Sequence, residues 1–391
     1  AVWRGSNVLG IRRLCTFLVP LLASLVTLPA SAMELGAEVS EQALIEAAKK
    51  TPTKLNIYNW SDYINPEAIP DFEREFGIQV TYDIYDSSEI VDTKLMTGNS
   101  GYDIVVHASS FTARLAPAGI FHQVDFDRLP NWHHLDPTLI RKADEKYSNG
   151  LQGVPFFWGT TGIAYNVNLI KQRMADAPVD SSALIFDPEV IAKFTDCGIS
   201  FLDDPTSVIP MAMLYLGYPA NSVDLEHLRE VEQLVKSVRP YVTYFSSTKM
   251  LQDLPSEEVC IAMSWSGDYS VASNRAREAG IDIELDYIIP KEGSGMWFDN
   301  LYIPADAPHK ENAYLFLNYM LRPEVIAAST DYIGYANANK SATPLVDPKI
   351  AENIAIYPDA STLERLQTTE VLAPKEERKR SRTWTKIKTG L

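Results

Sequence analysis

Three separate segments of the chain place a tryptophan shortly before an aspartate. They read, in chain order, WSDY at 60–63, WSGD at 265–268 and WFD at 297–299. A carboxylate binds an ammonium group through charge-assisted hydrogen bonds worth about 1.5–3 kcal/mol each, and an indole face attracts the same cation by about 0.5–2 kcal/mol. Indoles also cover methylene groups, each worth about 0.8 kcal/mol when buried. If the segments converge, they predict a site for ammonium groups joined by methylenes, whereas each segment alone is typical of a solvated strand end.

Other kinds of site fit these segments less well. None of the three contains Lys or Arg, which an anion site would recruit. A sugar site also combines Trp with Asp, so this alternative stays open. The G-x-S-x-G and HExxH motifs are absent, and of the six histidines only His133 and His134 are adjacent. We therefore expect a binding protein that is not an enzyme and that uses no metal or cofactor.

Strand-like and helix-like runs alternate along the chain. Strand-like runs over 54–60, 78–86 and 102–109 are separated by helix-like runs, and a second unit of the same kind begins near 160–170. This rhythm predicts an α/β fold with parallel sheets, and the first turn lacks the G-x-G-x-x-G of a dinucleotide site. Ligands of such folds bind beyond the carboxyl ends of strands. We expect all three Trp–Asp segments at such ends, facing one cleft between two lobes.

The segment 1–32 has the pattern of a secretory signal peptide. Arg12 and Arg13 lead into an apolar run that begins at Leu14 and ends in the small residues Ala-Ser-Ala. The lone Cys15 stands at the start of this run and not at its cleavage end, which argues against a lipoprotein anchor. No other segment has 18 uninterrupted apolar residues, so we expect an exported, soluble mature chain.

The chain is acidic, with 51 acidic and 35 basic residues and a formal net charge of −16. Such a field repels nucleic acid and raises the local concentration of cationic ligands, although solubility alone would also explain it. We expect no nucleic-acid partner. The basic end at 374–391 holds Trp384 and Ile387 three residues apart, which predicts a docked terminal helix instead of a nucleic-acid tail.

Two cysteines lie beyond the signal segment, Cys197 and Cys260. In an oxidising compartment an even number of cysteines favours a disulfide, while two free buried thiols are the alternative. The residues by themselves leave both possibilities open.

With these residues assembled, the chain resembles the periplasmic polyamine-binding proteins, the putrescine/spermidine receptors of bacterial ABC importers. The shared motifs run along nearly the whole mature length: IYNWSDYI, GYDIVV, TTGIAYNV, CGISFLD, SWSGDYSVASNRA, IPKEGSGMWFD, FLNYMLRPEV, YANANKSATPLV and RTWTKIK. The resemblance implies a two-lobed periplasmic binding protein fold of type II with the ligand cleft between the lobes. Lobe 1 is expected to comprise 53–157 plus 284–330, and lobe 2 to comprise 158–283 plus 331–391.

The resemblance also implies which residues contact the ligand. It places carboxylates for the amino groups at Asp268 and Asp299, and indole walls at Trp265 and Trp297. The further ligand contacts that it implies are Trp60, Ser61, Asp62, Tyr63, Ser110, Ser247 and Tyr335. A disulfide between the two mature cysteines is a further implication.

Three positions bear on which polyamine is bound. Asp204 stands where putrescine-selective relatives look to carry a small apolar residue, and Trp297 stands where they tend to have Phe. Glu370 stands where a putrescine-type relative carries a basic residue. Against this, Ser207 replaces an acidic contact and Ala108 replaces a serine that touches the ligand. We expect spermidine to be favoured over putrescine, with Asp204 and Glu370 among the ligand-binding residues.

The resemblance therefore implies a monomeric periplasmic protein that captures a polyamine between two closing lobes. Its partner would be the membrane permease of an ABC importer, to which it delivers the ligand. Two alternatives of other kinds stay open, namely a sensor or sugar-binding protein of the same fold and a carbohydrate-active enzyme.

Overall fold

The computed structural model describes residues 41–85, 88–144, 152–370 and 372–390. The signal peptide predicted over 1–32 lies outside the described residues. Within the described part of the chain, no helix has both the length and the apolar character needed to cross a membrane.

Strands and helices alternate from the first described residues to the last. The strands are β1 (Lys54–Trp60), β2 (Gln79–Tyr85), β3 (Ile104–Ala108), β4 (Phe121–His122), β5 (Val154–Asn166), β6 (Ile199–Phe201), β7 (Tyr244–Phe245), β8 (Ile261–Trp265), β9 (Leu285–Ile288), β10 (Ser294–Pro304), β11 (Ala336–Asn337) and β12 (Leu366–Thr368). The α-helices are α2 (Ala68–Phe76), α3 (Ser88–Thr97), α4 (Ser109–Leu115), α5 (Pro137–Asp144), α6 (Val167–Arg173), α7 (Ala183–Phe186), α8 (Pro188–Ile191), α9 (Pro205–Tyr215), α10 (Leu225–Val238), α11 (Met250–Asp253), α12 (Ser266–Glu278), α13 (Lys310–Met320), α14 (Pro323–Ile333), α15 (Pro348–Ala351), α16 (Ala360–Glu364) and α17 (Pro374–Thr389).

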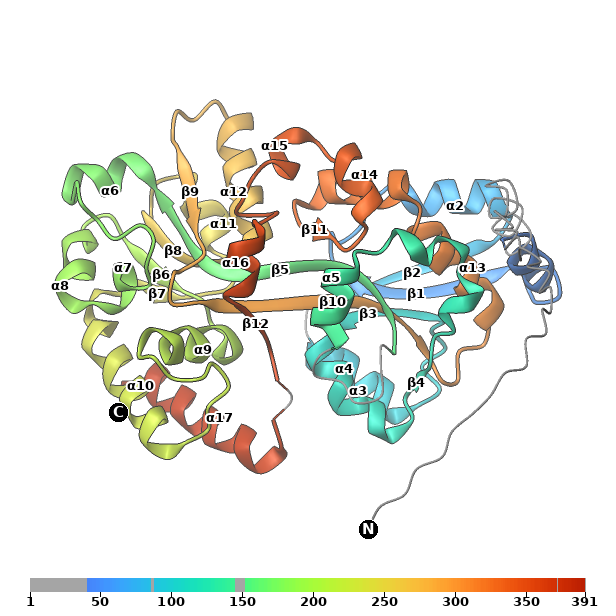
Figure 1. The fold of residues 1–391 in the computed structure, drawn as a ribbon, viewed down its shortest axis with the longest axis horizontal. Coiled ribbons are helices and arrows are strands. Elements are labelled where there is room, and N and C mark those ends of the chain that lie inside the picture. Colours follow the sequence, from blue (N-terminus) through green and yellow to red (C-terminus); the bar gives the residue numbers. More distant parts are fainter. Residues whose placement is uncertain (1–40, 86–87, 145–151, 371, 391) are drawn as a thin grey trace, which may run out of the picture.

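Two sheets share one long strand, β5. The first sheet has the order β2-β1-β3-β10-β5, with β1, β2 and β3 parallel and β10 antiparallel to both of its neighbours. The second sheet has the order β7-β6-β8-β5, and β9 also pairs with β5. Figure 1 shows β5 and β10 running between the two halves of the molecule. The predicted two-lobed α/β fold is therefore confirmed, with β5 and β10 as its crossing strands.

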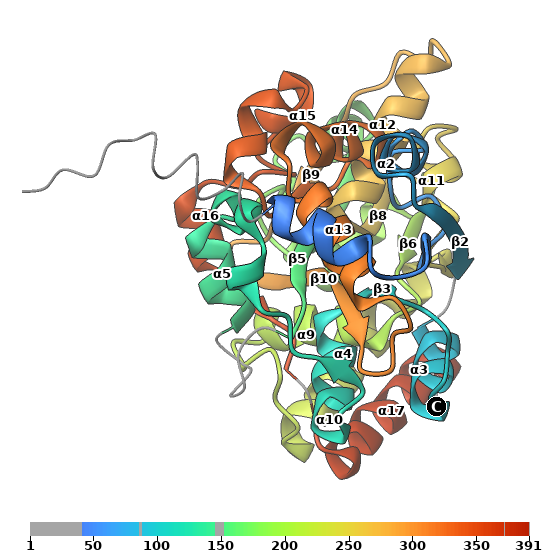
Figure 2. The same cartoon turned by 90° about the vertical axis from the view of Figure 1, so that its right-hand side faces the viewer.

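Helices cover the sheets because their apolar residues recur at helical spacing. In α10 the buried residues Leu228, Val231, Val235 and Val238 form one stripe. Asp224 caps the start of this helix, because its carboxylate accepts the backbone N–H groups of Glu226 and His227. In lobe 1, α2 lies on one side of the sheet and α3 and α4 lie on the other (Figure 1, Figure 2). The inner strands β1 and β3 are thus largely buried, while the edge strand β2 keeps exposed residues such as Ile84.

The carboxyl-terminal helix α17 docks on the second lobe. It packs against α9 and α10, and Arg380, Thr383 and Ile387 are buried on its inner face, while Trp384 is partly buried against the same core. The basic residues of its outer face are exposed to solvent. The predicted docked terminal helix is confirmed.

The predicted lobe boundaries stay a prediction. The strand pairing gives one reason to adjust them, because β11 pairs with Phe157 and Trp158 on the half of β5 that belongs to the first sheet. The backbone of Asn339 likewise bridges to Leu135. We propose that the segment around β11 belongs with lobe 1, although the sequence pattern places it in lobe 2.

A disulfide joins Cys197 and Cys260, with the two Cα atoms 5.4 Å apart. Both cysteines are buried, and the bridge ties the start of β6 to the start of β8 in lobe 2. The disulfide implied by the resemblance is therefore present, and the alternative of two free thiols is not.

Replacing both cysteines by alanine is expected to lower the free energy of unfolding by about 2–4 kcal/mol. The bridge closes a loop between residues separated by 63 positions, and its loss releases that loop in the unfolded chain. Urea denaturation followed by circular dichroism measures the change. Wild-type protein treated with a reductant should unfold like the double variant, and equal midpoints for the oxidised wild type and the variant would contradict the prediction.

Candidate functional site

The three Trp–Asp segments occupy two kinds of position. Trp60 ends β1 and Trp265 ends β8, as predicted for residues that face a cleft. The third segment lies inside β10, so its predicted place at a strand end is wrong. The carboxylate of Asp299 is tolerated there because the pairing of β10 with β5 shifts register between Asp299 and Asn300 and because a phenol donates to it.

The first buried carboxylate is that of Asp299. The hydroxyl of Tyr63, in the loop after β1, donates to its Oδ2 atom at 2.7 Å, and both side chains are only 8% exposed. Burial raises the pKa of Asp299 from 3.8 to about 6, and the Tyr63 hydrogen bond and the charge of His107 offset this only in part. The pKa of Tyr63 is raised well above its ordinary value, mainly by burial and then by the charge of Asp299. The phenol therefore remains a hydrogen-bond donor at neutral pH.

The second carboxylate is that of Asp268, in the first turn of α12. The hydroxyl of Tyr335 donates to its Oδ1 atom at 3.2 Å. Burial raises the pKa of Asp268 to about 6, while the Tyr335 hydrogen bond and the charge of Arg275 act in the opposite direction. Two aspartates 31 residues apart in sequence, the half-buried Asp268 and the buried Asp299, thus each accept a hydrogen bond from one phenol.

Aromatic rings join the two carboxylates into one cluster. The ring of Tyr335 lies 5.9 Å from that of Tyr63 and 5.3 Å from that of Trp297, both edge to face. Trp60 packs against Tyr85, with ring centroids 4.5 Å apart. The indole N–H groups of Trp60 and Trp297 are buried and have no hydrogen-bond partner among the described residues. Five of the predicted residues, Tyr63, Asp268, Trp297, Asp299 and Tyr335, are therefore brought together in a single cluster of phenols, indole and carboxylates.

Trp265 is connected to Asp204 by a chain of hydrogen bonds. Its indole N–H donates to the hydroxyl of Ser207 at 3.1 Å, and that hydroxyl donates to Oδ2 of Asp204 at 2.5 Å. Asp204 also accepts the backbone N–H and the hydroxyl of Thr206 at 3.0 and 2.8 Å and so caps α9. The carboxylate predicted to bind an amino group is thus already engaged by its own helix.

The remaining predicted residues lie at more exposed positions. Ser61 and Asp62 are exposed in the loop after β1, where Asp62 has a φ of 52°. Ser110 in α4 and Ser247 in the loop after β7 are half-buried. The last of the set, Glu370, is exposed, and its backbone N–H lies 3.5 Å from the side-chain oxygen of Asn221. Their roles in binding stay predictions.

Three residues of this region were missed by the sequence analysis. Tyr85 packs against Trp60, and Gly267 lies against the ring of Tyr335. Ser207 accepts the indole N–H of Trp265, whereas the sequence indicated only that it replaces an acidic residue. A signal existed for two of them. Tyr85 ends a strand at the same edge as Trp60, and a glycine inside a helical segment indicates close approach of another group.

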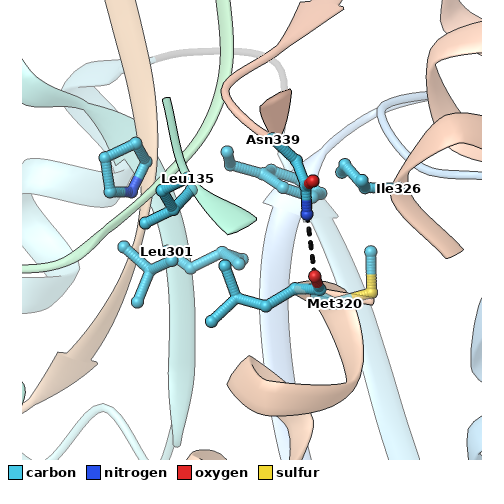
Figure 3. Close-up of a pocket in the computed structure, with 9 residues that line it drawn as sticks. Leu135, Leu301, Met320, Ile326 and Asn339 are labelled. Atoms are coloured by element: carbon cyan, nitrogen blue, oxygen red, sulfur yellow. Dashed lines mark hydrogen bonds between the residues drawn. The ribbon is translucent and has the colours of Figure 1, made fainter. Parts of the chain in front are cut away.

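Two hollows have linings that include none of the five cluster residues. One, of about 10 Å³, has room for one water at most and is lined mainly by apolar side chains, among them Leu135, Leu301, Met320 and Ile326, and by Asn339 (Figure 3). The side-chain amide of Asn339 there donates to the carbonyl of Leu321 at 2.7 Å. The other is a surface groove of about 660 Å³ along α3 whose lining includes Lys94. Neither lining contains a carboxylate, so neither suits an ammonium group.

Comparison with known proteins gives consistent matches. The sequence profile of a family described as bacterial extracellular solute-binding protein matches residues 67–358. The chain is 44% identical over 348 residues to the putrescine-binding periplasmic protein PotF of Escherichia coli K12, covering 88% of this chain and 93% of the relative. It is 43% identical over 337 residues to the putrescine-binding periplasmic protein SpuD of Pseudomonas aeruginosa, covering 86% and 92%.

Solved structures agree with this result. The spermidine/putrescine ABC transporter substrate-binding protein PotD of Streptococcus pneumoniae superposes with a TM-score of 0.74 at 29% identity. The match covers 86% of this chain and 98% of that one.

Replacing Asp299 by asparagine is expected to stabilise the ligand-free protein. A carboxyl whose pKa rises from 3.8 to about 6 on folding destabilises the fold fully above pH 6 and not at all below about pH 4. The free energy of unfolding of the variant should therefore exceed that of the wild type by up to about 3 kcal/mol at pH 8, and the difference should vanish near pH 4.

Urea denaturation at both pH values measures this difference. Asp282→Asn, which removes an exposed carboxylate, is the matched control and should differ little from the wild type at either pH. A variant at Asp299 that is less stable than the wild type at pH 8 would contradict the assignment of a destabilising buried charge.

Proposed function

The chain belongs to the family of bacterial extracellular solute-binding proteins and is not an enzyme, and we propose that it captures putrescine in the periplasm for an ABC importer. The observation that supports this most strongly is the pair of carboxylates formed by the buried Asp299 and the half-buried Asp268. For both, burial outweighs the nearby basic groups, Arg275 and His107, so the ionised forms are poorly compensated by the protein itself. A ligand with two ammonium groups supplies the missing charge.

The aromatic rings of the cluster suit the remainder of such a ligand. Trp297, Tyr63 and Tyr335 offer faces that cover methylenes and attract the cations, at about 0.8 kcal/mol for each buried methylene and about 0.5–2 kcal/mol for each cation–ring contact. A sugar offers no charge to the two carboxylates, and this disfavours the sugar-binding alternative. In the bound state each ammonium would take the place of a phenol as donor to the carboxylate, or would share the carboxylate with it.

The expected preference for spermidine is not supported. The relatives that are 43% and 44% identical are both named as putrescine-binding, whereas relatives named for spermidine as well as putrescine are 29% to 33% identical. The physical reason lies in Asp204. The third acid that favoured a triply charged ligand caps α9 with Oδ1 and accepts the hydroxyl of Ser207 with Oδ2, so it offers little to a further amino group.

Closure of the two lobes is the mechanism that we propose for capture. Tyr63 comes from a loop of lobe 1, Asp268 comes from α12 of lobe 2, and Tyr335 contacts both. A diamine that bridges the two carboxylates would make all of its contacts only when these parts are close together, so binding would shift the population toward the closed form. The closed form would then dock on the permease of the importer.

Isothermal calorimetry with putrescine tests the proposed function. We expect binding by the wild type, and a loss of about 10- to 150-fold in affinity for Asp268→Asn and for Asp299→Asn, because each removes one charge-assisted contact worth about 1.5–3 kcal/mol. Asp282→Asn, which lies on the exposed surface, should bind like the wild type. A wild type that gives no heat with putrescine, or equal affinities in all four proteins, would contradict the proposal.

The affinity for putrescine is also expected to depend on pH. Only the ionised carboxylates attract the ammonium groups, and the pKa of each is about 6 in the ligand-free protein. Between pH 8 and pH 5 the affinity should therefore fall by about tenfold for each carboxylate, since about nine tenths of each is protonated at pH 5. A dissociation constant that stays the same across this range would show that these carboxylates do not bind the ligand.

A further inference from the structure

Gly267 lies in direct contact with the ring of Tyr335. A Cβ atom at position 267 would come within 2.2–2.3 Å of three atoms of that ring, which is far closer than any real contact of this kind. Gly267 belongs to α12, where alanine is ordinarily preferred over glycine by about 1 kcal/mol. Helix formation therefore gives no reason for a glycine here, while the ring of Tyr335 gives one.

The backbone next to Tyr335 approaches the same helix. Gly334 ends α14 in the left-handed conformation, with a φ of 80°, and a Cβ atom there would lie 3.1 Å from the hydroxyl of Ser270 and 3.5 Å from the carbonyl of Gly267. Two glycines thus let the segment that carries Tyr335 lie against α12. Because neither glycine has a side chain, α12 and the ring of Tyr335 can lie this close together.

The ring of Tyr335 is held from its other sides as well. It contacts Trp297 on β10 and Tyr63 in the loop after β1, so it cannot move away from α12 without displacing one of these rings. The two carboxylates are attached to this stack at its ends. Asp268 accepts from the hydroxyl of Tyr335, and Asp299 accepts from the hydroxyl of Tyr63.

We propose that Gly267 is a positioning residue that determines which length of diamine the site prefers. The distance between the two carboxylates is set by the chain of contacts Asp268–Tyr335–Tyr63–Asp299. The distance between α12 and the ring of Tyr335 in that chain depends on the absence of a side chain at position 267. A methyl group at this position acts as a spacer between α12 and Tyr335. It moves Asp268 away from Asp299 and so favours a diamine with one more methylene. The inference rests on the proposed function, because it needs a ligand with an ammonium group at each end.

The test compares 1,4-diaminobutane with 1,5-diaminopentane by calorimetry. In Gly267→Ala the ratio of the two dissociation constants should shift toward the longer diamine by about fourfold, which corresponds to one buried methylene. Gly295→Ala is the matched control. Gly295 lies on the same strand as Trp297, and a Cβ atom at this position would meet no atom closer than 4.0 Å. Its ratio should equal that of the wild type.

Removing the ring tests the cause of the shift. In a Tyr335→Ala background, adding Gly267→Ala should leave the ratio unchanged, since no ring remains for the methyl group to displace. Tyr335→Leu, which thins the stack without any change at Gly267, should shift the preference toward 1,3-diaminopropane and serves if Gly267→Ala does not fold.

The outcomes separate this inference from the proposed function. A shifted ratio in Gly267→Ala that disappears in the Tyr335→Ala background supports it. If Gly267→Ala weakens both diamines by the same factor, Gly267 has only a structural role, the inference is overturned and the proposed function stands. If the wild type binds neither diamine, both are overturned.

Discussion

The structure depends on the burial of two negative charges that the protein itself does not neutralise. Asp299 is buried and Asp268 is half-buried, each accepts a hydrogen bond from one phenol, and the pKa of each rises to about 6 because loss of hydration outweighs the nearby basic groups. An ionised carboxylate in such surroundings costs free energy until a cation joins it. The site is therefore least stable in the state in which it is ready to bind, and a dicationic ligand relieves this cost.

The fold makes such an arrangement possible because the two sheets share the long strand β5. β5 pairs with β10 in one lobe and with β8 in the other, so the end of β1, the start of α12 and the middle of β10 are brought together. The disulfide in lobe 2 and the docking of α17 on α9 and α10 stabilise that lobe away from the site. Stability is thus supplied by the cores, while the carboxylates that weaken the fold lie between them.

Much of the fold could be predicted from the sequence, since alternating apolar runs and the order of strands and helices specify an α/β architecture. The site was harder to predict, because the sequence of a carboxylate next to an aromatic residue is the same whether the carboxylate faces a ligand or caps its own helix. Asp204 illustrates this: an aspartate directly before Pro205 is a typical helix start, and the capping of α9 follows from that local signal. Asp299 was misplaced because only tertiary pairing shows that β10 continues through it, and Gly267 was overlooked because its contact with Tyr335 joins distant segments.

The most direct test of this account is the titration of the carboxyl carbons of Asp268 and Asp299 by nuclear magnetic resonance, with and without putrescine. We expect both carboxyls to titrate near pH 6 in the free protein, and we expect saturating ligand to lower both pKa values below about 4, because an ammonium group stabilises the ionised form. Titration curves that are the same with and without ligand would contradict it.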